Sequence, residues 1–154
     1  MAEDRSPADL AAWMRHEHQA QIELAKVLRE HLANPPQVGR GAWLDSLRSG
    51  FERFFAHLRR NFKAQETGGY LTTLVELRPT LSKQVEQLRG EHAELLRMAG
   101  RIQAELAEVG ETDRLQSADL TARILRFVAI VTQHDQRENM LTLFVFNEDI
   151  GAGD

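Results

Sequence analysis

The chain has 154 residues, no cysteine and a formal net charge of −4 at pH 7. This length supports one folded unit with a substantial core, so we expect a single domain over residues 1–154. Without thiols there can be no disulfide, iron–sulfur cluster or zinc finger, and any metal must be held by nitrogen and oxygen atoms. The acidic balance, with no dense basic patch, argues against nucleic acid as a partner.

Nothing in the sequence indicates export or membrane insertion. The first ten residues carry acidic groups and lack an apolar run that could serve as a secretory signal. No segment approaches the roughly 20 apolar residues that a membrane span requires. We therefore expect a cytoplasmic protein with no membrane partner.

The residue pattern predicts an all-α chain. Leu, Ala, Glu, Gln and Arg dominate, and β-branched residues are sparse. Ser6 followed by Pro7 is typical of a helix N-terminus, and Asn34-Pro35-Pro36 ends the helix that follows. Gly68-Gly69 ends another, and Thr112 or Ser117 can cap the last one. The four expected helices cover residues 7–33, 42–67, 79–108 and 115–147.

Apolar residues recur along these helices in steps of three and four, the spacing of a coiled-coil-like seam. Polar residues enter the seam of every helix. They are His18 and Gln21, Asn61 and Gln65, His92, and His134 and Glu138. Four helices joined by short connections favour an antiparallel up-down-up-down four-helix bundle.

The two halves of the chain resemble each other in these polar positions. Glu17-His18 and Glu91-His92 are 74 residues apart, and Asn61 precedes His134 by 73. Counting from the helix ends places the three histidines and Asn61 at the same height within about one turn. We therefore expect them to share one layer of the core.

Glu138 follows His134 by one helical turn and would point into that layer. Burying an unpaired carboxylate is costly. A metal ion would supply the compensating charge, since neutral imidazoles donate lone pairs to it. Alternatively, the compensating charge could come from a proton. His92 and His134 would then be hydrogen-bonded core residues, and Glu138 would pair with a protonated histidine or an arginine. We favour the metal, because ionisable groups seldom converge in a core without a function.

The segment His134-Asp135-Gln136-Arg137-Glu138 is similar to the H-x-x-x-E motif in the last helix of the hemerythrin-like family, and the chain resembles that family over nearly its whole length. Glu17-His18 and Glu91-His92 are similar to the single histidines of its first and third helices. The resemblance implies a bundle around a non-heme di-iron centre. It also implies sensing, storage or carriage of oxygen, nitric oxide or iron.

The second helix departs from the family pattern, because Asn61 and Gln65 stand where a second H-x-x-x-E would fall. Amide oxygens are poorer ligands for iron than imidazoles or carboxylates. His57, one turn before Asn61, could replace the missing histidine of a di-iron site, assisted by Glu66. The other solution, which we favour, is a single iron or zinc ion. Its ligands would be His18, His92, His134 and Glu138.

Two functions therefore remain open for the predicted bundle. One is a metal protein that binds a diatomic ligand, and the other is a metal-free structural or partner-binding bundle, which Asn61 and Gln65 favour. An oxidase or peroxidase would need a substrate pocket and a proton donor, and the sequence indicates neither, so we expect no enzyme. The chain is expected to be a monomer or a homodimer.

Overall fold

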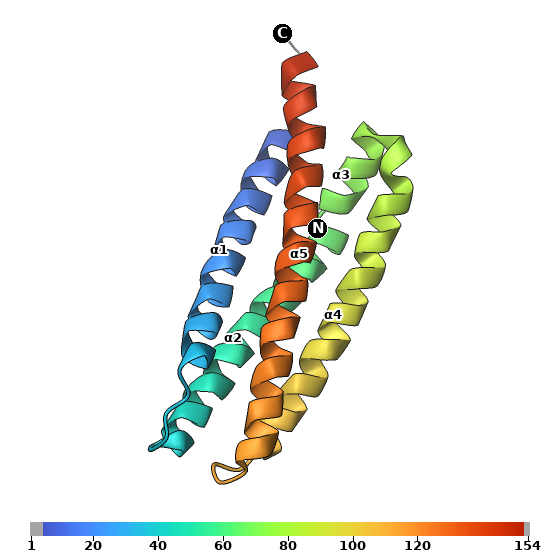
Figure 1. Cartoon of the computed structure of the whole chain (residues 1–154). Coiled ribbons are helices and arrows are strands. Elements are labelled where there is room, and N and C mark those ends of the chain that lie inside the picture. Colours follow the sequence, from blue (N-terminus) through green and yellow to red (C-terminus); the bar gives the residue numbers. More distant parts are fainter. Residues whose placement is uncertain (1–4, 153–154) are drawn as a thin grey trace.

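A computed structural model of the chain describes residues 5–152, with side chains up to Phe146. Within those residues the chain is all-helical and contains no strand. The elements are α1 Pro7–Ala33, α2 Arg40–Thr67, α3 Tyr70–Leu77, the short 3-10 helix η1 Pro79–Leu81, α4 Ser82–Glu108 and α5 Arg114–Ala152. Figure 1 shows the four long helices side by side along their lengths, with α3 at the end where α2 leads into α4. None of the described helices is apolar over enough residues to cross a membrane.

Helix α1 has the expected bounds, and its N-terminus is capped as predicted. The Ser6 hydroxyl accepts a hydrogen bond from the Asp9 backbone N–H at 3.2 Å. This bond satisfies one of the amide groups that a helix start leaves without an internal partner. Asn34 follows the last residue of α1, and Gly68 follows the last residue of α2, where the sequence placed both stops.

The chain between α2 and α4 corrects the prediction, which left this segment as a connection. Gly69 has a φ of +90°, in the left-handed region that favours glycine, and an additional helix, α3, follows it directly. The expected helix start at Pro79 is the 3-10 helix η1, and α4 begins at Ser82. Helix α3 forms because the apolar side chains Tyr70, Leu71 and Leu74 are fully buried against the neighbouring helices.

Helix α5 also differs from its prediction at both ends. Its N-terminal cap is Asp113, whose carboxylate accepts from the Gln116 backbone N–H at 3.1 Å, and not Thr112 or Ser117. Ser117 is instead buried, and its hydroxyl accepts a hydrogen bond from Arg40 at 2.8 Å. The helix continues to Ala152, beyond the expected end at residue 147.

Two apolar clusters form the core, and a polar layer separates them along the helices. The larger cluster includes the fully buried Phe51, Phe54 and Leu58 of α2. The smaller cluster joins α3 to α1, α4 and α5. Between the clusters, the buried polar seam residues are Gln21, Asn61, Gln65, His92, His134 and Glu138. The fold therefore places ionisable and amide groups in a layer that water hardly reaches.

Candidate metal centre

Three ionisable side chains from α4 and α5 converge in this polar layer. His92, His134 and Glu138 are only 1%, 1% and 2% exposed, and one potential ligand atom of each lies within 4.8 Å of the others. Glu138 Oε1 is 2.7 Å from Nε2 of His134 and 3.8 Å from Nε2 of His92. His134 and Glu138 face the same way because residues four apart share one face of a helix. We call these three residues the metal cluster.

Several atoms of the metal cluster have no hydrogen-bond partner in the described part of the chain. They are both ring nitrogens of His92 and Oε2 of Glu138. Buried polar atoms are nearly always paired, and an unpaired one costs about 1–3 kcal/mol. Two imidazoles and a carboxylate are a donor set that Fe(II) and Zn(II) accept. The residues present therefore fit a bound cation.

Glu91 fixes the orientation of one ring in the cluster. Its Oε2 atom lies 2.6 Å from Nδ1 of His134, and its Oε1 atom lies 2.6 Å from a guanidinium nitrogen of Arg137. Because a carboxylate only accepts, Nδ1 of His134 carries a proton, and Nε2 is directed toward Glu138. Glu91 therefore links Arg137 to the His134 ring, and the sequence did not predict its contact with His134.

The charges in the cluster support one another. Burial opposes ionisation of Glu138, but the adjacent His134 and His92 imidazoles hold its pKa below the ordinary value. Burial likewise opposes charge on His134, yet the carboxylates of Glu138 and Glu91 raise its pKa above the ordinary value. Each of the two groups therefore favours the charged form of the other, and a cation would compete with a proton on Nε2 of His134.

Helix α2 presents an aromatic ring and amides to the cluster. The Phe62 ring stacks on His92 with a centroid distance of 3.9 Å and meets His134 edge-on at 5.5 Å. Asn61 and Gln65 are buried, and the Gln65 amide donates to Asn61 Oδ1 at 3.3 Å. Asn61 and Gln65 are neutral and therefore add no negative charge to the polar layer.

The comparison with family models decides the classification. The model of the hemerythrin HHE cation-binding domain matches residues 9–143. The chain belongs to the hemerythrin family. Searches among curated proteins and among solved structures returned no significant match. The matched range includes the metal cluster and both amide positions of α2, so the asymmetry between α2 and α5 lies inside the hemerythrin domain.

His18 lies beside the metal cluster of this hemerythrin domain but outside the group within 4.8 Å. Its side chain is half-buried on α1. Burial lowers the pKa of His18, and the negative charge of Glu138 partly opposes that shift. His18 is therefore near enough to feel the Glu138 charge, while its role as a metal ligand stays a prediction.

His57, the fifth ligand considered from the sequence, is held by α1 and not by the cluster. Its Nε2 atom lies 2.9 Å from a Glu17 carboxylate oxygen, and its Nδ1 atom is 2.5 Å from Gln21 Oε1. Burial lowers the pKa of His57, against the effect of Glu17. Glu66, expected to assist, lies closer to the cluster, with Oε1 3.9 Å from Nδ1 of His92.

Two further buried groups near the cluster were not found from the sequence. The Tyr70 hydroxyl hydrogen-bonds Thr142, whose own hydroxyl donates to the Glu138 carbonyl at 2.8 Å. Burial and the charge of Glu138 raise the pKa of Tyr70, so the phenol stays neutral. Asp135 is 7% exposed, and burial together with the charge of Glu138 raises its pKa to about 8. Thr142 could have been noticed, since it continues the face of His134 and Glu138 by one more turn.

Proposed function

We propose that this hemerythrin domain binds one non-heme metal ion, iron in the first place and zinc as the alternative. His92, His134 and Glu138 would be ligands, and His18 would complete the set from α1. The proposal depends above all on the convergence of two imidazoles and a carboxylate, several of their atoms unpaired, in a buried layer. We also propose that the four long helices form an antiparallel up-down-up-down bundle around this site.

A single ion is proposed because of the chemistry of α2. Two cations in close contact need bridging anionic ligands to reduce their repulsion. Asn61 and Gln65 are neutral amides already bonded to each other, and Phe62 covers His92 with an apolar ring. His57 is engaged with Glu17 and Gln21. Because of these contacts, the proposed ligands on α4 and α5 form one compact set that suits a single ion.

The proposed activity is the binding or sensing of oxygen, nitric oxide or iron itself. A bound iron ion would supply redox chemistry and an open position for a diatomic ligand. The residues around it have defined tasks: Glu91 orients the His134 ring, and the Phe62 ring excludes water from the side of α2. As parts of the same proposal, the protein acts in the cytoplasm, as a monomer or homodimer, and not as an enzyme.

The second candidate function is a metal-free bundle that serves a structural or partner-binding role. The observation in its favour is the Asn61–Gln65 amide pair on α2. In that case the His134–Glu138 ion pair would be a permanent part of the core. The two functions differ in one measurable property, the metal content of the purified protein.

Elemental analysis of protein purified without a metal-affinity tag tests the proposal. The wild type should contain about one equivalent of iron or zinc, and His134→Ala should lose it. His57→Ala is the matched control, since it removes a buried histidine outside the cluster and should retain the metal. A wild-type protein without metal would support the second function. A protein that contains only zinc would support the metal site but exclude reversible binding of oxygen or nitric oxide.

A further inference from the structure

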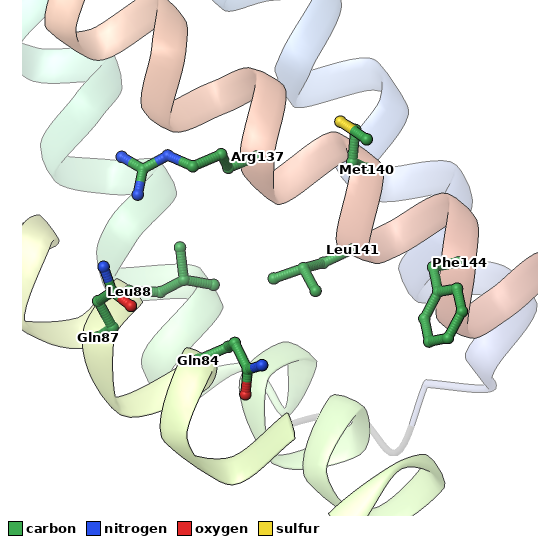
Figure 2. Close-up of a pocket in the computed structure, with 7 residues that line it drawn as sticks. All are labelled: Gln84, Gln87, Leu88, Arg137, Met140, Leu141 and Phe144. Atoms are coloured by element: carbon green, nitrogen blue, oxygen red, sulfur yellow. The ribbon is translucent and has the colours of Figure 1, made fainter. Parts of the chain in front are cut away.

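The surface of the protein has a groove between α4 and α5 (Figure 2). Its volume is about 410 Å³, within the range of roughly 300–1,000 Å³ that is usual for small-molecule sites. Its lining consists of Gln84, Gln87 and Leu88 on α4 and of Arg137, Met140, Leu141 and Phe144 on α5. None of these residues belongs to the ligand set proposed above.

The groove is apolar along most of its length. Leu88 and Leu141 point into it from opposite helices (Figure 2). Met140 and Phe144 remain 69% and 48% exposed. A single exposed apolar side chain is common, but here four apolar side chains border the same hollow. An apolar ligand would therefore remove a substantial apolar area from water.

Arg137 places a guanidinium at one end of the groove. Arg137 is the one charged residue among those that line it, and its side chain is 52% exposed. Its contact with Glu91 uses Nη1, one of the three guanidinium nitrogens, so further N–H donors remain for a second anion. The amides of Gln84 and Gln87 lie along the α4 side (Figure 2). The groove thus complements a molecule with an anionic head and an apolar body.

The length of the groove sets the size of that molecule. Arg137 and Phe144 are seven residues apart on α5, which is about 10 Å along the helix axis. An extended eight-carbon carboxylate has about eight bonds from a carboxylate oxygen to its last carbon, which at about 1.2 Å per bond comes close to this distance. We propose that the groove binds a small organic monoanion with an apolar tail, a medium-chain carboxylate. Its head would pair with Arg137 and its tail would lie against Leu141 and Phe144.

A ligand in the groove would influence the metal cluster through two successive contacts. Arg137 lies 2.6 Å from Glu91, and Glu91 lies 2.6 Å from the His134 ring. A carboxylate on the remaining N–H donors of Arg137 shares the guanidinium with Glu91 and so changes the charge beside that ring. The effect on a bound metal rests on the proposed function, whereas binding in the groove does not.

Isothermal titration calorimetry of the purified full chain with sodium octanoate tests the proposal, before and after treatment with a chelator. Octanoate should bind saturably at one site, and acetate, which has the head without the tail, should not. Arg137→Gln and Phe144→Ala should each weaken octanoate binding roughly tenfold or more. The matched controls are Arg126→Gln and Leu143→Ala, which change exposed α5 residues outside this groove. They should leave the affinity within about twofold.

Three results would overturn the proposal. One is the absence of saturable octanoate binding, and another is binding that Arg137→Gln and Phe144→Ala leave unchanged. The third is self-association of the wild type in sedimentation that Phe144→Ala abolishes, since the groove would then hold a second copy. Because chelator-treated protein is included, a wild type that lacks metal still gives a decisive answer on the groove.

Nuclear magnetic resonance of the imidazole nitrogens tests the link to the metal cluster. In chelator-treated protein, octanoate should shift the His134 ring signals and leave those of His57 unchanged, because His57 contacts α1 and not Glu91. The shift should disappear in Arg137→Gln. Octanoate binding without any change at His134 would contradict the link.

Discussion

Glu91 on α4 accepts a hydrogen bond from Nδ1 of His134 on α5 across a distance of 2.6 Å. This contact fixes which ring nitrogen of His134 faces Glu138, and it makes that nitrogen more basic. Replacing such a supporting carboxylate usually costs about 10–100-fold in metal affinity. Glu91→Gln keeps the size of the side chain and removes its charge, so the affinity should fall within that range.

The affinity of Glu91→Gln can be measured by competition with a chromophoric chelator. Glu94→Gln is the control, because Glu94 lies on the same helix and pairs at the surface with Arg97. It should bind metal like the wild type. Equal affinities of Glu91→Gln and the wild type would show that Glu91 does not support the centre.

The amide positions of α2 should determine how many ions the domain binds. The double change Asn61→His and Gln65→Glu restores an imidazole and a carboxylate at positions that are buried beside the cluster. The added negative charge would offset the repulsion between two cations. Metal content by elemental analysis should therefore rise from about one equivalent to about two. If the content of the double variant stays at one, another feature of α2, such as the Phe62 ring against His92, limits the site.

Asp135 should make the metal-free fold less stable as the pH rises. Burial raises its pKa from an ordinary 3.8 to about 8 in the folded chain. Because the folded pKa exceeds the unfolded one, its contribution to stability is complete below pH 3.8 and is lost as the pH rises through 8. Asp135→Asn cannot ionise and should therefore exceed the wild type in unfolding free energy by at least about 1 kcal/mol near pH 8.

Urea unfolding at pH 4 and pH 8.5 measures this difference for Asp135→Asn, which should nearly vanish at the lower pH. Asp119→Asn provides the control, since that carboxylate is exposed on the same helix beside Arg123 and its pair contributes little. A stability difference that is the same at both pH values would mean that the Asp135 carboxyl titrates normally.

The buried hydrogen bond between Tyr70 and Thr142 should couple α3 to α5. The Thr142 hydroxyl donates to the Glu138 carbonyl, so the Tyr70 hydroxyl is the donor in its bond with Thr142. Thr142→Val leaves a buried phenol without an acceptor and should cost about 1–3 kcal/mol. Adding Tyr70→Phe removes the unpaired group and should recover most of that loss. Purely additive losses in thermal unfolding of the two single variants and the double variant would contradict this coupling.

The long helices followed from the sequence because their apolar spacing determines which faces are buried. Leu28, Leu47, Leu95 and Ile124, which follow this spacing, are buried. Helix α3 was missed because Gly68-Gly69 and Pro79 enclose a segment shorter than a typical isolated helix. Its stability comes from packing, which a local pattern does not contain.

Only part of the polar layer could be predicted in the same way. Heights along the helices brought His92, His134 and Glu138 to one level, and the structure brings these three together. Height does not fix the rotation and tilt of a helix, so the half-buried position of His18 could not be derived. The partners of Glu91 and His57, and the burial of Asp135, depend on side-chain directions across helix pairs.

Anaerobic titration of metal-free protein with Fe(II), followed by calorimetry, tests the metal cluster most directly. The wild type should bind one equivalent and release a proton, because the ion displaces the proton on Nε2 of His134. Glu138→Gln, which removes the one carboxylate of the cluster at similar volume, should weaken binding by at least about tenfold. Absence of Fe(II) binding by the wild type, or equal binding by Glu138→Gln, would contradict a metal site at His92, His134 and Glu138.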